Sequence, residues 1–317
     1  QESRGINSET IYLADGDTDV RLSTIPTTWG ESVVMRILKP SAISVDFVDL
    51  GWRPLLEKKL LKEPKKPYGM VITPGPTGSG KTTTLYAFLK KTKTPELKII
   101  TIEDPIEYHL EGIEQTQVEP ESGYTFASGL RSILRQDPDI MLVGEIRDLE
   151  TAEVAIHAAL TGHLVFSTLH TNDAASGVTR LLDMGIEPFL LVSAVKSFIA
   201  QRLVRRLCED KEKYQLSEKE LKQFSKLINM ERVEQLLRKE GLLKESQHIK
   251  DVPFYRPSKS SDCPDGYKGR LGIFEVLPVT ETIKELVNRR AGADDIERQA
   301  RQEGRITMVE DGRAQAA

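Results

Sequence analysis

The chain has 317 residues, 39% of them hydrophobic, which predicts a substantial core and more than one domain. Its net charge of −4 and its pI near 5.9 give no overall electrostatic basis for binding nucleic acid. Only two cysteines occur, Cys208 and Cys263, so a disulfide-stabilised secreted scaffold is excluded and a cytoplasmic setting is indicated. The longest apolar run, 189–195, is too short to cross a bilayer, and we therefore expect membrane contact only through partners.

Residues 1–50 contain short runs of alternating apolar and polar residues at 11–13, 20–23 and 32–38. Such alternation is typical of strands with one buried face, and we interpret the segment as the C-terminal part of a small N-terminal α/β domain. The sequence begins without methionine, and we expect this domain to be truncated. Arg21 and Arg36 lie on the polar side of the alternation, where a solvated role is the simplest interpretation.

Residues 51–67 contain prolines and lysines and predict a linker that includes a short helix over 54–62. An apolar strand at 68–73 follows, and a helix is predicted from 83 to 91. Between them, the sequence matches the phosphate-binding pattern G-x-x-x-x-G-K-[ST] at every fixed position. A glycine-rich turn that binds nothing is the alternative, but the flanking strand and helix favour the phosphate site.

The loop residues are therefore predicted to bind ATP, because their backbone N–H groups can cradle phosphate oxygens at the positive end of a helix. Lys81 is expected to contact the β- and γ-phosphates, and the Thr82 hydroxyl to bind Mg²⁺. The predicted nucleotide-binding residues are Gly75, Pro76, Thr77, Gly78, Ser79, Gly80, Lys81, Thr82 and Thr83.

From 68 to 207, predicted strands and helices alternate as a parallel α/β sheet requires. Glu103 follows a strand at 98–102, Glu145 follows a strand at 139–143, and His170 follows a strand at 164–169. The carboxyl ends of parallel strands are where such sheets bind ligands. We predict that Glu145 polarises water beside Mg²⁺, that Glu103 is a second carboxylate, and that His170 senses the γ-phosphate.

Helical apolar spacing then predicts helices at 172–184 and 189–207. Residues 208–266 form a charged stretch with two amphipathic segments, interpreted as a solvated helical insertion. Residues 267–317 predict a final strand and helix region.

Three long motifs now indicate a family. They are Thr101–Tyr108, Leu130–Asp148 and Thr161–Asn172, and they resemble the Asp box, Walker B and His box of the secretion ATPases. Together with the phosphate-binding loop they occur in the family's order and cover most of the chain. The resemblance is to the assembly ATPases of type II secretion and type IV pili.

This resemblance implies a RecA-like ATPase core, a preceding small domain, and a homo-hexamer that hydrolyses ATP to assemble a pilus or pseudopilus. It implies a cytoplasmic location peripheral to the inner membrane, with a platform protein of that membrane and a cytoplasmic adaptor as partners. It also implies that Arg21 and Arg36 approach the nucleotide from the small domain. Within the core, Arg131, Arg135 and Arg147 could serve instead, or could pair with Asp137 or Asp139.

Relatives of this type often carry paired C-x-x-C motifs for structural zinc, whereas this chain keeps one cysteine at each place. A closed zinc site requires four ligands, usually cysteine or histidine, and His248 or an Asp would complete it poorly. We therefore expect no zinc, and a 208–266 module that is held by packing alone or is partly mobile.

Two other functions remain open. A pilus retraction ATPase shares the core, although retraction-type relatives generally lack an insertion such as 208–266. A nucleic-acid motor or an ATP-binding switch is the second alternative, but no basic and aromatic platform for a nucleic-acid strand is evident.

Overall fold

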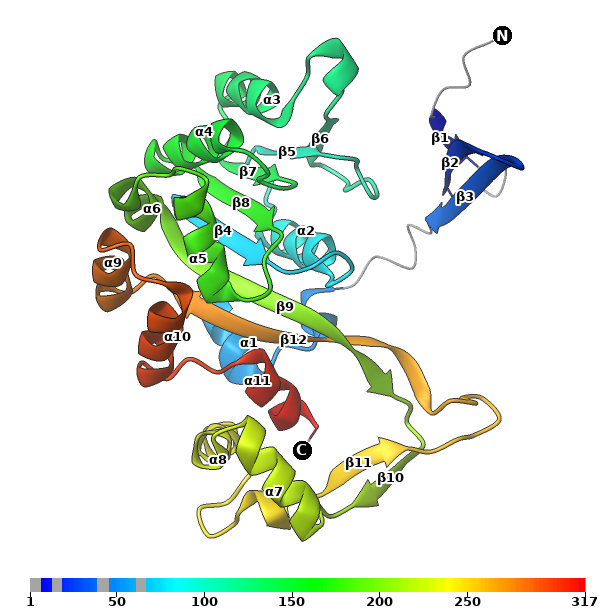
Figure 1. Cartoon of the computed structure of the whole chain (residues 1–317), viewed down its shortest axis with the longest axis vertical. Helices are drawn as coiled ribbons and strands as arrows, with labels where there is room; N and C mark the ends of the chain where they lie inside the picture. Colours follow the sequence, from blue (N-terminus) through cyan, green and yellow to red (C-terminus); the bar gives the residue numbers. More distant parts are fainter. Residues whose placement is uncertain (1–6, 13–18, 39–45, 61–66, 317) are drawn as a thin grey trace.

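The chain folds around a seven-stranded sheet, seen in the computed structural model (Figure 1), which describes residues 7–12, 19–38, 46–60 and 67–316. The strand order is β12-β9-β4-β8-β7-β5-β6, and all neighbouring strands are parallel except β12 and β9. The strand that precedes the phosphate-binding loop, β4, is the third in this order and lies between β9 and β8. This arrangement confirms the predicted α/β class with a RecA-like core.

Strands and helices alternate along most of the chain. The strands are β1 (Asn7–Tyr12), β2 (Asp19–Thr27), β3 (Gly30–Leu38), β4 (Gly69–Pro74), β5 (Ile99–Glu103), β6 (Glu114–Gln117), β7 (Ile140–Val143), β8 (Leu164–Leu169), β9 (Val195–Leu207), β10 (Lys211–Tyr214), β11 (Phe254–Pro257) and β12 (Tyr267–Pro278). The helices are α1 (Pro54–Leu60), α2 (Lys81–Thr92), α3 (Phe126–Ile133), α4 (Leu149–Leu160), α5 (Ala174–Asp183), α6 (Pro188–Ala194), α7 (Glu218–Leu227), α8 (Met230–Lys239), α9 (Glu281–Asn288), α10 (Ala293–Gln302) and α11 (Met308–Gln315).

The central strands are buried on both faces, which explains their nearly continuous apolar sequences. On β4, Met70 and Ile72 face one apolar cluster, which includes residues of α3, α4, α5, α6, α9 and α10. Val71 faces the opposite cluster, to which α2 contributes Phe88. Helices on both faces therefore hold the sheet rigidly, and the loops at the carboxyl ends of its strands are left at one edge.

Residues 46–60 pack on the core, although we assigned residues 51–67 to a linker. Trp52 is buried and stacks on Phe274 of β12, with 3.7 Å between the ring centroids. Phe47 and Leu60 are also buried in the cluster that contains α2. The helix predicted at 54–62 is present as α1.

The prediction of a helix over 189–207 is wrong beyond residue 194. Residues 188–194 form α6, but 195–207 form the long strand β9, parallel to β4 and antiparallel to β12. The buried part of β9 is covered on both faces, so its apolar residues do not alternate with polar ones. Without that alternation, their spacing was misread as helical. The strand β12 joins the same sheet, so the core continues beyond the boundary that we placed after residue 207.

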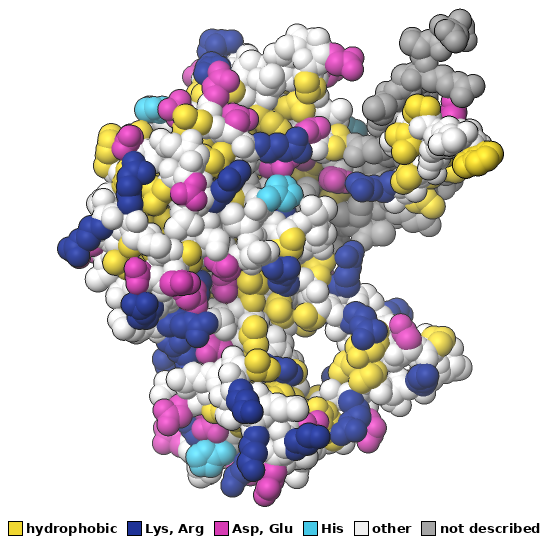
Figure 2. Space-filling model, in the orientation of Figure 1, with side chains coloured by type: hydrophobic (Ala, Val, Ile, Leu, Met, Phe, Trp, Pro, Cys, Tyr) yellow, Lys and Arg dark blue, Asp and Glu magenta, His cyan; other side chains and the backbone are white. Residues whose placement is uncertain are grey.

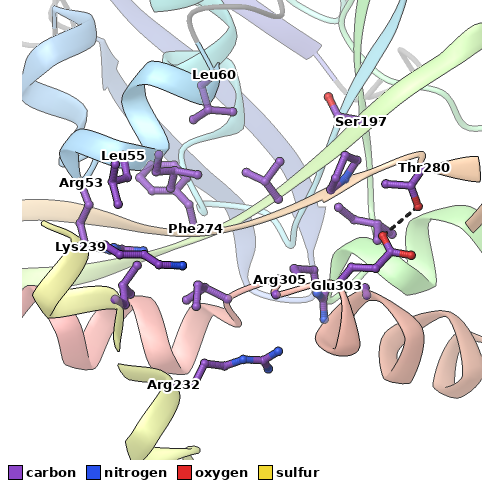
Figure 3. A pocket seen from close by; sticks show the side chains of 18 of the residues that line it. Arg53, Leu55, Leu60, Ser197, Arg232, Lys239, Phe274, Thr280, Glu303 and Arg305 are labelled. Atoms are coloured by element: carbon purple, nitrogen blue, oxygen red, sulfur yellow. Dashed lines mark hydrogen bonds between the residues drawn. The ribbon is translucent and has the colours of Figure 1, made fainter. Parts of the chain in front are cut away.

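Residues 208–266 form a small module, in which the two predicted amphipathic segments are confirmed as α7 and α8. The module also contains a two-stranded sheet of β10 and β11, and a core of its own that includes Phe224, Val233 and Phe254. Cys208 and Cys263 are joined by a disulfide, so the module is held by a cross-link as well as by packing. A cavity lies between α8 and the core (Figure 3).

The N-terminal strands form a separate three-stranded antiparallel sheet, β1-β2-β3, that confirms the predicted strands. Figure 1 draws this sheet apart from the core. The apolar side chains of Val34, Met35 and Ile37 on β3 are exposed, and Figure 2 shows hydrophobic side chains on the visible face of this sheet. In the register of β2 and β3, Arg21 lies opposite Arg36.

Candidate active site

The phosphate-binding loop joins the central strand β4 to α2. Gly78 and Gly80 have φ angles of 77° and 88°, which side chains rarely adopt, and these allow the loop to turn its N–H groups inward. The Lys81 ammonium donates to the carbonyl oxygens of Gly75 and Pro76 at 2.7 and 3.1 Å. Lys81 is therefore folded over the loop, where it can exchange carbonyl oxygens for phosphate oxygens.

Burial lowers the pKa of Lys81, and the nearby charge of Glu145 partly opposes that shift. Glu145 follows β7, so it lies at the same carboxyl edge of the sheet as Lys81. The structure thus places Glu145 and the loop in one electrostatic environment, although they are 64 positions apart in the sequence.

Gln201 of β9 supports the loop from the side and was missed in the sequence. Its buried amide donates to the Ser79 carbonyl at 2.7 Å, and a Cβ on Gly80 would lie 3.0 Å from the same amide nitrogen. Gln201 was not recognised as a contact of the loop because residues 189–207 were predicted to form a helix. The loop conformation therefore depends on a strand more than 100 residues away.

Glu145 follows β7 and is 8% exposed. One carboxylate oxygen is ion-paired with Arg147, and the other lies 3.0 Å from His170 Nε2. Arg147 also reaches Asp104 at 3.5 Å, and the hydrogen bond to Glu145 raises the pKa of Arg147. The structure thus brings the predicted Glu145 and His170 together with Arg147, one of the three core arginines considered for this site, and with Asp104, which was not singled out.

Arg147 is the one core arginine that reaches this cluster among the three considered. Arg131 pairs with Glu150 on α4, and Arg135 donates to Ser132. Within the described part of the chain none of these arginines pairs with Asp137 or Asp139, and Asp139 accepts from the Lys98 backbone N–H at 2.7 Å.

Glu103 is 3% exposed and lies in a separate hydrogen-bond cluster at the end of β5. Its oxygens accept from Tyr86, Thr101 and Gln115, with the last two at 2.6 and 3.1 Å. Burial raises the pKa of Glu103, partly opposed by these donors. Burial also raises the pKa of Tyr86. A direct role of Glu103 at the nucleotide stays a prediction.

We expect Glu103→Gln to stabilise the fold more at pH 8 than at pH 5. A carboxyl with a raised pKa in the folded state binds its proton more tightly when the protein is folded. The free energy of unfolding of the wild type therefore falls as the pH rises through that pKa, whereas that of the glutamine variant does not change for this reason. The glutamine keeps the shape without the buried charge. Urea unfolding of both proteins at the two pH values measures this, with Glu114→Gln on the exposed strand β6 as the matched control. An equal effect of Glu103→Gln at both pH values would contradict the raised pKa.

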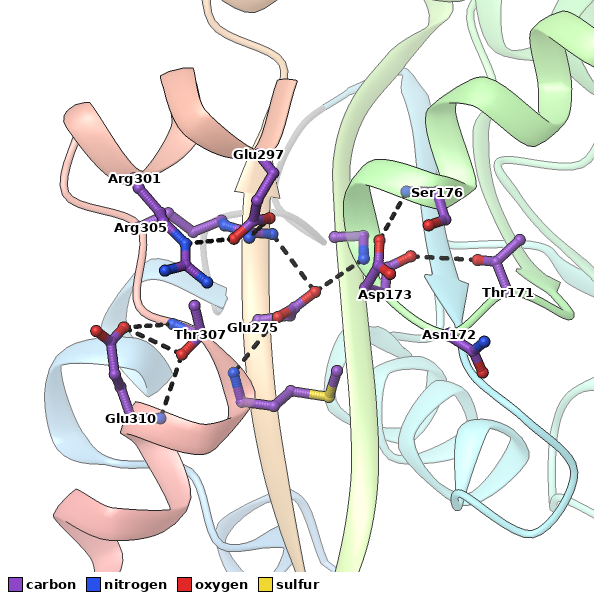
Figure 4. A network of polar contacts seen from close by, with 12 residues as sticks. Thr171, Asn172, Asp173, Ser176, Glu275, Glu297, Arg301, Arg305, Thr307 and Glu310 are labelled. Carbon is purple, nitrogen blue, oxygen red and sulfur yellow. Dashed lines mark hydrogen bonds and ion pairs between the residues drawn. The ribbon is translucent and has the colours of Figure 1, made fainter. Parts of the chain in front are cut away.

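The segment after His170 is held by a buried ionic network (Figure 4). Asp173 caps α5 by accepting from the Ser176 N–H at 2.7 Å. The N–H of Ala174, the first residue of α5, donates to Glu275 of β12 at 2.8 Å. Glu275 also lies 3.4 Å from Arg305, which is almost fully buried and pairs with Glu297 of α10. This network fixes the position at which α5 begins and hence the loop that carries His170.

The small-domain arginines are not connected to this site by any contact that the structure describes. Arg36 is exposed on β3, and only the backbone position of Arg21 is described. Their predicted approach to the nucleotide therefore stays a prediction.

The residues fit the Mg²⁺ and ATP that the sequence predicted. The Thr82 hydroxyl has no hydrogen-bond partner among the described residues, so it is available to a metal ion. The Thr73, Ser79 and Thr84 hydroxyls around the loop are buried without a hydrogen-bond partner. Such unsatisfied groups beside a glycine-rich loop suit a polar ligand.

The described residues contain no group of three or more His, Cys, Asp or Glu arranged to hold a metal ion. The structure brings Cys208 and Cys263 together, and their sulfurs are bonded to each other. We predict that elemental analysis of the purified protein finds less than about one tenth of a zinc per chain, because four suitable ligands are lacking. One zinc per chain after reduction of the disulfide would contradict this prediction.

None of the described helices combines the length and the apolar composition that a membrane crossing requires.

The sequence matches one protein family along nearly its whole length. The profile of the family described as type II/IV secretion system protein matches residues 8–317. The chain is 47% identical to type II secretion system protein E of Xanthomonas campestris pv. campestris over 301 residues, which are 95% of this chain and 50% of the relative. It is 44% identical to the type IV pilus assembly ATPase PilB of Thermus thermophilus, over 93% of this chain and 32% of the relative. The chain thus spans about half or less of the length of these curated relatives.

Among solved structures, the pilus retraction motor PilT with bound ADP is similar with a TM-score of 0.64 and 26% identity, over 99% of this chain and 78% of that one. The ATPase DotB of Legionella pneumophila shares the fold with a TM-score of 0.59 and 19% identity, over 98% and 72% of the two chains. The chain belongs to the family of type II/IV secretion system proteins.

Proposed function

We propose that this chain is the ATP-hydrolysing part of a hexameric motor that assembles a type IV pilus or a type II secretion pseudopilus. The observation that carries the proposal is that the glycine-rich loop with Lys81 follows β4 and Glu145 follows β7, the two parallel neighbours of β8, so both lie at the carboxyl edge of the sheet. A buried cation and a carboxylate placed in this way can act on the two sides of a phosphoryl transfer, the phosphate and the attacking water.

In this proposal Lys81 leaves the Gly75 and Pro76 carbonyls and contacts the β- and γ-phosphates. Glu145 exchanges its contacts with Arg147 and His170 for the attacking water, from which it accepts a proton. His170 and Arg147 then lie beside the γ-phosphate that the water attacks. Mg²⁺, bound through Thr82 and through water on Glu145, would supply positive charge that neutralises the phosphates.

The choice of an assembly motor rests on the relatives. Their names describe type II secretion and type IV pilus assembly proteins at 44–47% identity. A retraction motor is the second candidate, since the pilus retraction motor PilT has a similar structure at 26% identity. The higher identity to assembly proteins favours assembly.

The proposed partners are five further copies of the chain, a platform protein of the inner membrane and a cytoplasmic adaptor, so the protein would be cytoplasmic and peripheral to that membrane. Nucleic acid is not proposed as a partner. Figure 2 shows Lys and Arg mixed with Asp and Glu over the visible face, without a continuous basic surface that a nucleic-acid strand would need.

The ATPase rate in the presence of possible partners tests this function. We expect the cytoplasmic part of the platform protein from the same secretion or pilus system to raise the rate several-fold. Single- or double-stranded DNA is expected to leave it unchanged. Stimulation by DNA and not by the platform protein would contradict the assignment.

We further expect Arg21→Ala and Arg36→Ala to keep ATP affinity within a few-fold but to lower turnover by at least about tenfold, as loss of a transition-state contact does. The two positions are paired in the backbone register of β2 and β3. Nucleotide titration and steady-state ATPase of the assembled hexamer measure both quantities. Arg206→Ala, on an exposed part of β9, is the matched control. Normal turnover of both variants would make these arginines surface residues.

A further inference from the structure

A cavity of about 940 Å³ lies between the core and the 208–266 module, away from the nucleotide loop (Figure 3). Its walls come from α1, β12, α8 and the segment 300–306, and none of residues 75–82 lines it. Its size is at the upper end of the range for small-molecule sites. The cavity is therefore separate from the site described above.

The walls of the cavity are fixed by a buried ion-pair cluster. Arg53, which precedes α1, is 7% exposed and donates at 2.6 Å both to Asp311 of α11 and to Glu240 at the end of α8. These bonds join the segment before α1 to the end of α8 and to α11, which are far from it in the sequence. The cavity is thus preformed, so a ligand need not order it on binding.

One side of the cavity is apolar. Leu55, Leu56 and Leu60 come from α1, Phe274 from β12 and Leu236 from α8. Leu60 and Phe274 are at most 1% exposed, so they form a firm floor. An apolar ligand body of several carbon atoms is favoured on such a surface.

The cavity is also lined by cationic side chains, two of which make no ion pair with the described residues. The cationic lining residues Arg53 and Arg305 are paired with carboxylates, and the acidic lining residue Glu303 accepts from Thr280, Thr282 and Gln299. Arg232 and Lys239 of α8 also line the cavity, but neither makes an ion pair with the described residues. Figure 3 labels both side chains, which extend from α8.

We propose that this cavity binds an anionic amphiphile, whose apolar body lies on the α1 leucines and Phe274 and whose carboxylate or phosphate contacts Arg232 and Lys239. A cavity that combines an apolar floor with two cations that have no ion pair in the described part of the chain complements a ligand with those two parts. Charge-assisted hydrogen bonds to the head group would orient it, because such bonds are stronger than neutral ones.

The cavity is also connected to the nucleotide site. Arg305 lines it, and the same guanidinium lies 3.4 Å from Glu275, which holds the N-terminus of α5 just after the His170 loop. The Arg305 Nε is buried without a hydrogen-bond partner, so this residue is not fully satisfied by the protein. The occupied cavity would therefore contact the network that positions His170.

The test uses the purified chain and the fluorescent probe 11-(dansylamino)undecanoic acid, displaced by decanoate, decyl phosphate or uncharged decanol. We expect saturable binding of one probe per chain, displacement by at least one of the two anions, and at least tenfold weaker displacement by decanol. Displacement by either anion supports the site, and the tighter one assigns the head group. Absence of saturable binding, or equal displacement by decanol, would overturn the proposal.

Two variants locate the binding in the cavity. The double variant Arg232→Gln with Lys239→Gln is expected to weaken probe binding at least about tenfold, whereas Lys222→Gln with Lys226→Gln on the exposed face of α7 leaves it unchanged. Leu236→Trp fills part of the cavity and is expected to weaken binding as well, whereas Leu242→Trp, at an exposed position outside it, does not. Thermal unfolding verifies that each variant is folded. Unchanged binding in both cavity variants would place the probe elsewhere.

Discussion

Lys81→Ala is expected to reduce ATP hydrolysis to background and to weaken ATP binding at least about tenfold. The Lys81 ammonium is the buried cation of the phosphate-binding loop, and its removal leaves the Gly75 and Pro76 carbonyls facing the phosphates without a positive charge. A charged hydrogen bond of this kind contributes about 1.5–3 kcal/mol to binding, and the transferring phosphoryl group requires still more neutralisation.

Phosphate release and titration with a fluorescent ATP analogue measure the two effects separately. The matched control is Lys91→Ala, which removes an exposed lysine from the last turn of the same helix, α2. We expect the control to keep both wild-type values. Wild-type turnover in Lys81→Ala would show that ATP is bound elsewhere.

Glu145→Gln is expected to bind ATP within about threefold of the wild-type affinity but to hydrolyse it about 10²–10⁴ times more slowly, the range typical for a general base. The amide has the shape of the carboxylate but cannot accept the proton of the attacking water. It also loses the ion pair with Arg147, and the contact with His170 becomes that of a neutral amide.

Single-turnover hydrolysis with the enzyme in excess separates chemistry from product release in this variant. Glu153→Gln, at an exposed position on the neighbouring helix α4, is the matched control. If Glu145→Gln instead lost ATP binding with little change in the chemical step, the carboxylate would hold the metal ion and another group would be the base.

Much of the site was predictable because its residues lie next to strong local signals. The glycine-rich loop, Glu145 and His170 each follow an apolar strand, and parallel strands place such residues at one edge of a sheet. The predicted order of strands and helices from 68 to 188 is therefore close to the observed one.

The rest depended on tertiary contacts that leave no local pattern. Gln201 supports the loop from β9, a strand whose apolar residues also fit a helical period. The ion pair of Arg147 with Glu145 was not predicted because two residues in an irregular segment can point in many relative directions. Residues 46–60 have a linker-like composition, but Trp52 and Leu60 are buried against distant parts of the chain.

The cysteines illustrate the same limit. Cys208 and Cys263 are separated by 55 positions, and only the folded module brings them together. The low cysteine content argued only against a disulfide-stabilised secreted scaffold, and nothing in the sequence shows whether the two cysteines meet in the fold. Within the module, by contrast, α7 and α8 were predictable from their amphipathic spacing.

The most direct test of this account is an experimental structure of the chain with Mg²⁺ and a non-hydrolysable ATP analogue. We predict that the γ-phosphate lies within hydrogen-bond distance of the Lys81 ammonium, that the Thr82 hydroxyl binds the metal ion, and that a water held by Glu145 faces the γ-phosphorus. A nucleotide bound away from the 75–82 loop, or a γ-phosphate beyond the reach of both Lys81 and a water held by Glu145, would contradict it.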